Sequence, residues 1–402
     1  MVIDRQFSII DGATPKWVNE TLFESLLRKK VTDFSKLIKF STKYVNNCKE
    51  NYLSVKADFE TKDGKRRLMG FIMKTATLSH GEKLLPYLTS GSLAQENWMN
   101  FEIIPKFKAL FETENKPKTF HPTSLKFPQS VPEDYVLFED LQMKGYRPLQ
   151  GGLSSPQMEA VLNNLAAFHA ASAVEGNINQ SVNQRMVKTP NKELQLLINR
   201  IFHEHLRLYD LKDYEDKIKS LQSHFLEESS PSNSLEFQVL QVGNCCIDNM
   251  LFLLDAFGNV KDIAFINLDM CCYGNPVKDL LYLLLSSAIN ADKINNFDYY
   301  IKYYHDQLVG YLKLLKFKRK IPKLWELQYD VIKNNKWAFE AVTQVLPLVL
   351  WDPSNSNESN LSEEEELPIN DKFLKVMCAQ DNYCQQIQKL LPWMEDKAFL
   401  EE

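Results

Sequence analysis

The sequence lacks an apolar stretch long enough to span a bilayer. The longest candidate, residues 280–288, is far shorter than the roughly 20 residues that a spanning helix needs. The first residues, MVIDRQFSIIDG, mix charged with apolar side chains and contain no signal-peptide core. We therefore expect a cytoplasmic protein with no membrane partner.

The chain also lacks an excess of positive charge and has little glycine. It carries 47 Lys and Arg against 52 Asp and Glu, a net charge of -5. Binding to a nucleic-acid backbone needs a broad basic field, so we expect no nucleic-acid partner. Glycine accounts for only 13 of 402 residues, against an average of about 7%, which excludes an extended glycine-rich phosphate loop.

Cysteine occurs seven times, an odd number that favours reduced thiols in a chain of this length. Two adjacent pairs stand out, Cys245–Cys246 and Cys271–Cys272. Zinc-binding cysteines are generally two to four residues apart, so that both can reach one ion. We interpret both pairs as small packed side chains rather than metal ligands.

The composition is that of a folded protein, with 44% hydrophobic and 25% charged residues. A chain of 402 residues is too long for one compact core and predicts two lobes.

The period of apolar residues changes along the first lobe. Helical spacing within the first 35 or so residues predicts an amphipathic helix. Its apolar positions are Val18, Leu22, Leu26 and Leu27. Extended segments at 51–59 and 67–74 flank an Asp-Gly turn, which predicts a β-hairpin.

Two further elements precede the expected boundary between the lobes. Ser92 and Gln95 resemble a capping box that opens a helix to about Ile104, where Pro105 would end or interrupt it. Residues 135–138 resemble a strand and are followed by acidic residues and a turn at Gly145. We place the first lobe at 1–138, a hinge at 139–145 and the second lobe at 146–402.

The second lobe is predicted to be mostly helical. Ser155 would cap a first helix with Pro156 at its start and an apolar stripe along one face. Further helices are predicted at about 191–209, 213–227, 276–289, 296–316, 322–345 and 370–391. A β-rich hairpin region interrupts them at 236–269, with extended runs at 236–242, 250–254 and 260–266. The acidic stretch 353–366 is predicted to be a mobile loop.

A β-rich lobe, a hinge and a helical lobe with an inserted hairpin follow the order of a protein-kinase-like α+β fold, and several motifs agree. The most specific is QVGNCCIDNMLFLLDAFGNVKDIAFINLDMCCYGNPVKDLLYLLLSS, beginning at Gln241. Supporting matches are Glu50-Asn51-Tyr52-x-Ser54, Lys74, Glu96, Phe138-Glu139-Asp140-Leu141 and Leu165-Ala166-Ala167-Phe168-His169-Ala170. Together they resemble the ecdysteroid-kinase-like family, which is related to choline kinases and aminoglycoside phosphotransferases.

The resemblance implies a nucleotide site. Lys74 would contact the phosphates of ATP, and Glu96 would hold Lys74 in an ion pair. Asn51 and Ser54 would belong to the loop that covers the phosphates. Glu139, Asp140 and Leu141 would present backbone groups to the adenine. Asn249 would be the metal-coordinating amide of the catalytic loop.

The sequence departs from the family pattern at the positions that the resemblance implies for catalysis, metal binding and the phosphate loop. Asn244 replaces the aspartate that orients the substrate hydroxyl, and an amide has no basic lone pair for that task. Val242 replaces the loop histidine, and Asn267 replaces the principal metal-binding aspartate. Lys49 stands where the phosphate-covering loop would have glycine.

Displaced carboxylates could compensate for these losses. Asp269 shares a face with Asn267 if the strand stays extended, and Asp248 is adjacent to Asn249, so either could serve a shifted metal. The alternative is that both are solvated turn residues. We interpret Asp279 as a helix-start group and His169 as a satisfied core histidine rather than a catalyst.

Three hypotheses follow. The first is a catalytically impaired pseudokinase that binds a nucleotide or a small hydroxylated molecule, with Mg²⁺ weakly bound or absent, or that regulates a protein partner. The second is an active ATP-dependent O-phosphotransferase on a small alcohol or steroid-like substrate. The third is an interaction scaffold with an empty cleft.

Overall fold

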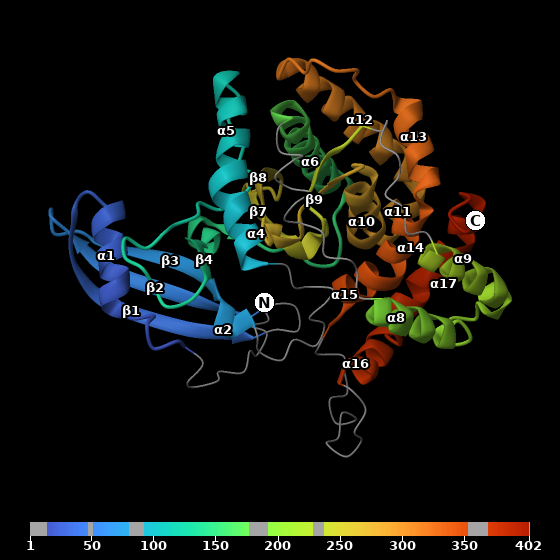
Figure 1. Cartoon of the computed structure of the whole chain (residues 1–402), viewed down its shortest axis with the longest axis horizontal. Helices are drawn as coiled ribbons and strands as arrows, with labels where there is room; N and C mark the ends of the chain where they lie inside the picture. The colour runs from blue at the N-terminus through green and yellow to red at the C-terminus, as the bar shows by residue number, and fades with distance from the viewer. Residues whose placement is uncertain are drawn as a thin grey trace. The chain divides into compact units, whose positions relative to one another are not determined.

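The computed structural model describes residues 14–46, 51–79, 92–176, 192–227, 237–352 and 369–401. They belong to two compact units, coloured along the chain in Figure 1. Unit 1 comprises Met1–Pro105, His121–Arg147 and Ala264–Met270, and unit 2 comprises Lys106–Phe120, Pro148–Ile263 and Cys271–Glu402. The acidic stretch 353–366 lies outside the described residues, so its predicted mobility stays a prediction.

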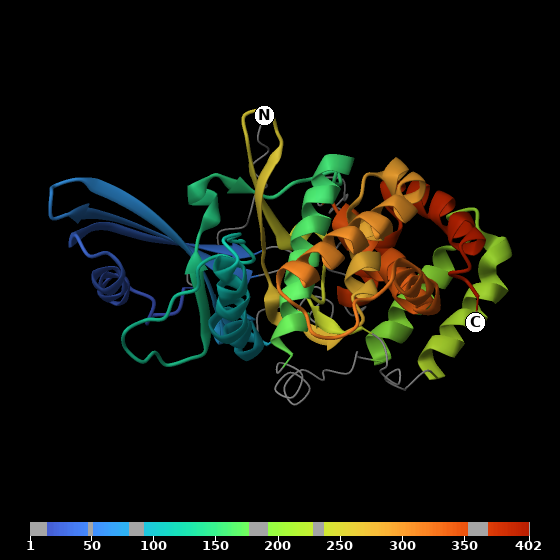
Figure 2. The same ribbon diagram turned by 90° about the horizontal axis from the view of Figure 1, so that it is seen from above.

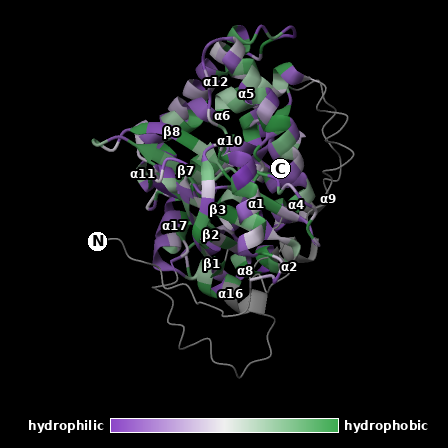
Figure 3. Ribbon diagram, turned by 90° about the vertical axis from the view of Figure 1, so that its left-hand side faces the viewer, coloured by the Kyte–Doolittle hydropathy of each residue, from purple (hydrophilic) through white to green (hydrophobic). Residues whose placement is uncertain are grey.

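Unit 1 is built on a four-stranded antiparallel sheet in the order β1-β2-β3-β4. The strands are β1 (Phe34–Asn46), β2 (Asn51–Thr61), β3 (Arg66–Thr75) and β4 (Tyr135–Glu139). Residues along β2 alternate between buried and more exposed, as expected for a strand with one face on a core. Figure 3 colours each described residue of the chain by its hydropathy.

Helix α1 (Glu20–Lys30) contributes its apolar stripe to the same core. The four residues that predicted this helix are all buried: Val18, Leu22, Leu26 and Leu27. The β2–β3 hairpin and β4 also confirm the predicted strands, whereas β1 was not predicted from the sequence.

The helix that follows Ser92 differs from its prediction. The Ser92 side chain makes no capping hydrogen bond, so the predicted capping box is not formed. Helix α4 (Leu93–Trp98) continues through a π-helical turn, η1 (Met99–Ile103), into α5 (Ile104–Thr113). Pro105 therefore does not end the helix. Its missing N–H is accommodated just after the widened turn, where the Ile104 N–H donates to the Met99 carbonyl.

Unit 2 is mainly helical. Its longest helix, α6 (Ser155–Glu175), buries the apolar stripe that predicted it. Ser154 rather than Ser155 precedes the helix, and its N–H donates to Gln157 Oε1 at 2.9 Å. The other helices are α8 (Lys192–His205), α9 (Glu215–Glu227), α10 (Val277–Ser287), α11 (Asn290–Asn295), α12 (Phe297–Leu314), α13 (Leu324–Lys333), α14 (Asn335–Glu340), η6 (Ala341–Val345), α15 (Leu346–Leu350), α16 (Ile369–Cys378) and α17 (Asp381–Asp396).

Two predicted helices are each divided in the structure. The predicted helix at 322–345 becomes α13, α14 and the π-helical η6, and the one at 370–391 is divided between α16 and α17. Helix α11 was not predicted.

The β segments of the second lobe belong to two small sheets rather than one hairpin. Strand β6 (Val239–Gln241) pairs with β9 (Cys272–Gly274) in antiparallel fashion. Strands β7 (Met250–Leu254) and β8 (Val260–Phe265) are neighbours in another sheet, visible in Figure 2. Two short 3-10 turns, η4 (Ile247–Asn249) and η5 (Leu268–Met270), flank this hairpin.

Within the described part of the chain, no helix combines the length and the hydrophobicity needed to cross a membrane.

Unit 2 contains a buried lysine, Lys293, that forms no ion pair with another described residue. Lys293 on α11 is 2% exposed, and its ammonium donates to Gln386 Oε1 at 2.6 Å. Burial away from water lowers the pKa of Lys293 to about 7. The unfolded chain would have the ordinary lysine pKa of about 10.4.

We expect this lysine to make stability depend on pH. Below pH 7 the amine is charged in both states, and the folded state bears the full cost of burying the charge. Between pH 7 and 10 only the unfolded chain holds the proton, so stability rises with pH. Relative to Lys293→Met, wild type should gain about 2 kcal/mol of unfolding free energy between pH 7 and 9 in urea denaturation. The control is Lys389→Met, which replaces an exposed lysine and should differ from wild type in unfolding free energy by the same amount at pH 7 and pH 9. The same constancy for Lys293→Met would contradict a lowered pKa of Lys293.

Candidate functional site

Unit 1 contains a buried cluster around Lys74. This residue lies near the end of β3 and is 5% exposed, and Glu96 on α4 is 1% exposed. The Lys74 ammonium donates to Glu96 Oε1 at 3.2 Å and Oε2 at 3.0 Å. It also donates to Asn267 Oδ1 at 2.9 Å. The ion pair that the resemblance implied is therefore present, and Asn267 joins it.

The acceptors that Lys74 contacts differ in charge. Two are oxygens of the Glu96 carboxylate, and one is the neutral amide oxygen of Asn267. An anionic ligand oxygen is a stronger acceptor than the Asn267 amide oxygen. Of the three contacts, the one to Asn267 is therefore the easiest for a phosphate to replace.

Asn267 adopts a backbone conformation that is uncommon for residues other than glycine. Its φ is +61°, in the left-handed region, where asparagine is enriched. Strand β8 ends at Phe265 and the 3-10 turn η5 begins at Leu268. The extended strand that would place Asp269 on the same face as Asn267 is therefore absent. The condition attached to that possible surrogate role is not met, because the chain turns here; Asp269 itself is half-buried on η5.

The predicted adenine-facing segment follows β4. Glu139 forms ion pairs with Lys144 and, at 2.6 Å, with Lys30. Burial alone would raise the pKa of Glu139, but these two cations outweigh it and hold the pKa below its usual value. The Glu139 carboxylate is thus held in ion pairs within unit 1. The predicted contact of this segment with adenine would therefore be made by its backbone groups.

The next two residues are fixed against β3. The Asp140 N–H donates to the Gly70 carbonyl at 2.9 Å, and the Asp140 carboxylate accepts from the Gln142 N–H. A side chain at Gly70 would come within 2.7 Å of Met143 and 3.0 Å of Asp140, so this close approach requires glycine. Leu141 is buried.

The residues predicted for the phosphate-covering loop are only partly described. Asn51 begins β2, is buried, and donates to the Leu78 carbonyl at 3.4 Å. Ser54 is half-buried within β2, opposite Lys43 of β1. Lys49 lies outside the described residues.

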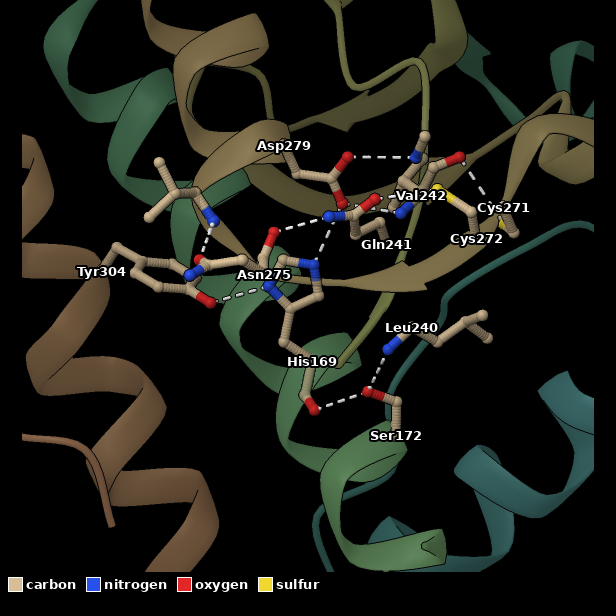
Figure 4. A network of polar contacts seen from close by, with 12 residues as sticks. His169, Ser172, Leu240, Gln241, Val242, Cys271, Cys272, Asn275, Asp279 and Tyr304 are labelled. Atoms are coloured by element: carbon tan, nitrogen blue, oxygen red, sulfur yellow. Dashed lines mark hydrogen bonds and ion pairs between the residues drawn. The ribbon is translucent and has the colours of Figure 1, made fainter. Parts of the chain in front are cut away.

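Unit 2 holds the second group of predicted residues, arranged around Asp279 (Figure 4). Asp279 is in the first turn of α10 and is fully buried. Its Oδ2 accepts from the Val242 N–H at 2.6 Å, and its Oδ1 accepts from the Gly243 N–H at 3.0 Å. Gly243 has a φ of +90°, which strongly favours glycine. Asp279 therefore fixes the backbone of the altered tripeptide 242–244.

His169 supports Asp279 from helix α6. Its Nε2 is 3.0 Å from Asp279 Oδ2 and its Nδ1 is 2.7 Å from the Tyr304 hydroxyl, with all three side chains fully buried. His169 is thus a satisfied core histidine, as the sequence predicted. Asp279 is a helix-start residue, as predicted, but it is also the main anchor of the loop, which the sequence did not reveal.

Two serines extend this framework. The Leu240 N–H donates to Ser172 Oγ at 2.9 Å, and the Ile247 N–H donates to Ser287 Oγ at 2.9 Å. Side chains from α6 and α10 thus hold the loop at both ends. Because all of these bonds are made to backbone N–H groups, they do not require an acidic side chain at position 244.

The residues at the catalytic positions are amides within this framework. The Asn249 side-chain amide donates to the Asn244 carbonyl at 2.8 Å. Asn244 Oδ1 is 3.7 Å from Cys246 Sγ. Asp248, the possible surrogate, is half-buried on η4. Asn244 and Asn249 lie in unit 2, whereas Lys74, Glu96 and Asn267 lie in unit 1.

Neither of the residues that the resemblance implies as Mg²⁺ ligands is a carboxylate. Mg²⁺ between phosphates is usually held by protein carboxylates, whereas Asn249 in unit 2 and Asn267 in unit 1 each offer a neutral amide oxygen. In the described ranges, no group of three or more His, Cys, Asp or Glu residues could hold a metal ion.

The four cysteines near the loop have packing contacts. Burial raises the pKa of the Cys245 thiol well above its usual value, so it stays protonated at neutral pH. Cys271 Sγ is 3.5 Å from the Val242 carbonyl, and Cys272 Sγ is 2.8 Å from Gln241 Oε1.

A sequence model described as the ecdysteroid kinase-like family matches residues 48–317, which is more than half of the chain. The family match and the fold thus define a kinase-like protein, with an antiparallel sheet in its first part and a helical second part. The chain belongs to the ecdysteroid kinase-like family. No curated protein matched it in sequence.

Solved structures of small-molecule kinases are similar over most of their lengths. A choline kinase from Cryptosporidium parvum is 12% identical, with 95% of this chain and 99% of that chain covered and a TM-score of 0.45. The GDP complex of a mutant aminoglycoside 2'-phosphotransferase-IIIa is 12% identical, with 82% and 97% covered and a TM-score of 0.40. An amicoumacin kinase in complex with AMP-PNP and Ca²⁺ is 10% identical, with 91% and 93% covered and a TM-score of 0.35.

Proposed function

We propose that this chain is a catalytically impaired kinase-like protein that binds a nucleotide without depending on Mg²⁺ and acts as a regulator of a protein partner or as a binder of a small hydroxylated molecule. The observation that carries the proposal is a contrast. Amides occupy both positions where the family has catalytic acids, Asn244 and Asn267, while the surrounding framework is intact.

The retained contacts support nucleotide binding. Lys74 is held by Glu96 and has one contact, to Asn267, that a phosphate oxygen can replace. The loop backbone is fixed by Asp279 whether or not residue 244 is acidic. Binding thus needs only the contacts that remain, whereas phosphoryl transfer needs the groups that have been replaced.

We expect ATP in the presence of a metal chelator to raise the melting temperature of the protein. A ligand at about 100 times its Kd adds about 2.7 kcal/mol to the stability of the folded state, an increase that differential scanning fluorimetry detects easily. In Lys74→Met/Glu96→Leu the charged pair is replaced by apolar side chains, which preserves packing without leaving a buried lone charge. We expect this variant to fold and to lose the ATP response.

The other hypotheses predict different results. An active phosphotransferase would respond to ATP only with Mg²⁺ present. An interaction scaffold would show no response to ATP under either condition.

A further inference from the structure

Helix α13 in unit 2 is apolar on its outer face as well as its inner face. Leu327 and Val331 face inward and are each 4% exposed. Trp325, Tyr329 and Ile332 are 61%, 62% and 51% exposed. These three residues follow helical spacing of four and three, so they lie on one face. We call them the α13 stripe.

Exposed apolar side chains are concentrated on helix α13 rather than scattered over the surface. Ten large apolar or aromatic side chains are exposed in the part of the chain that the structure describes, and three of them lie within this one ten-residue helix. Single exposed apolar residues need no explanation, whereas a row of them on one helix face does.

A strongly basic connection leads into the same helix. Between Gln307 and Trp325 the sequence contains no acidic residue. The six basic residues there are Lys313, Lys316, Lys318, Arg319, Lys320 and Lys323, and all are exposed. Two of them form ion pairs, Lys316 with Glu114 and Lys320 with Glu326, which leaves the segment with a clear positive excess.

This connection is ordered. Phe317 packs against Phe237 with ring centroids 6.0 Å apart, and Arg319 donates to the Ala173 carbonyl at 3.0 Å. His305 Nε2 is 2.9 Å from the Pro322 carbonyl. The basic side chains are therefore presented from a fixed backbone next to the first turn of α13, and Figure 1 shows α12 leading into α13.

The size of the stripe argues against a second copy of the chain as its partner. Fully buried aromatic side chains contribute about 150–250 Å² each, so the exposed parts of these three residues amount to something on the order of 300 Å². A stable protein interface needs roughly 800 Å² per partner. An apolar contact of this size can contribute to binding when electrostatic attraction to the partner adds to it.

We propose that the α13 stripe and the adjoining basic connection form a peripheral docking surface for an anionic lipid membrane. Trp and Tyr are enriched at membrane–water interfaces, and clustered Lys and Arg are attracted to acidic headgroups. This inference is independent of the nucleotide site. It differs from the sequence-based expectation of no membrane partner, which rested on the absence of a spanning segment.

Vesicle co-sedimentation of the full chain tests the proposal. We expect binding to phosphatidylcholine vesicles that contain phosphatidylserine and at least about tenfold weaker binding to pure phosphatidylcholine. Raising the salt from about 0.1 M to 0.5 M should release most of the bound protein, because salt screens the attraction.

Paired variants separate the two contributions. Trp325→Ala/Tyr329→Ala and Lys318→Glu/Lys323→Glu should each weaken binding at least about tenfold. Matched controls are Phe257→Ala, which removes a 91% exposed aromatic side chain on another loop of unit 2, and Lys261→Glu/Lys389→Glu, which makes the same charge change elsewhere. Both controls should bind like wild type.

Three outcomes would overturn the proposal. The first is equal binding to neutral and anionic vesicles or to neither. The second is an effect of the controls as large as that of the stripe variants. The third is a concentration-dependent dimer, seen by analytical ultracentrifugation, that Trp325→Ala/Tyr329→Ala abolishes, since this would identify a second copy as the occupant.

Discussion

Replacing Asp279 with alanine is expected to lower the free energy of unfolding by about 3–5 kcal/mol. Asp279 is fully buried and satisfies the N–H groups of Val242 and Gly243 as well as His169. In Asp279→Ala both N–H groups and the histidine lose their partner away from water, and each unsatisfied buried group costs about 1–3 kcal/mol. Urea denaturation measures the loss.

A milder variant keeps the experiment informative if alanine prevents folding. Asp279→Asn preserves volume but directs an NH₂ group toward one of the two backbone donors, so we expect a smaller loss, about 2 kcal/mol. Asp298→Asn is the control, because Asp298 is 71% exposed and pairs with Lys397 at the surface. It should change stability by less than about 1 kcal/mol. Equal effects at 279 and 298 would contradict the anchoring role.

Restoring an acid at position 267 is expected to make nucleotide binding depend on metal. In Asn267→Asp we expect Mg²⁺ to strengthen ATP binding at least about tenfold, because a carboxylate replaces a neutral amide as metal ligand. Asn244→Asp alone should leave metal dependence unchanged, since this position orients the substrate hydroxyl. The double variant should combine metal-dependent binding with a catalytic gain of about 10²–10⁴ over Asn267→Asp in single-turnover ATP cleavage.

The control for this experiment is Asn115→Asp. Asn115 is exposed and has a φ of 55°, so, like Asn267, it adopts the left-handed backbone conformation. Asn115→Asp therefore adds the same charge in the same backbone conformation at a position that does not contact Lys74. If Asn267→Asp behaves like Asn115→Asp, position 267 is not the metal position.

Secondary-structure elements with a clear pattern within a short stretch of sequence were predicted correctly. Alternation and an Asp-Gly turn were enough for the β2–β3 hairpin. Strand β1 was missed because register shifts between Phe34 and Lys36 and between Leu37 and Lys39 break its period of two. Of the two outcomes expected at Pro105, an end or an interruption of the helix, the structure shows an interruption by the π-helical turn at Met99–Ile103.

The site was predictable only where a motif marks it. Lys74 and Glu96 were found by resemblance, but the contact from Lys74 to Asn267 spans 193 positions and has no sequence signature. The same holds for His169, which meets Asp279 and Tyr304 from 110 and 135 positions away. Such contacts are set by how helices pack, and no spacing in the sequence encodes them.

We propose that this protein has lost the groups needed for phosphoryl transfer but keeps the contacts needed to bind a nucleotide. Calorimetric titration of the wild-type protein with ATP, once with Mg²⁺ and once with a chelator, tests it most directly. We expect binding in both titrations with dissociation constants that agree within about threefold, a difference below 1 kcal/mol. Binding that appears only with Mg²⁺, or that Mg²⁺ strengthens tenfold or more, would contradict it.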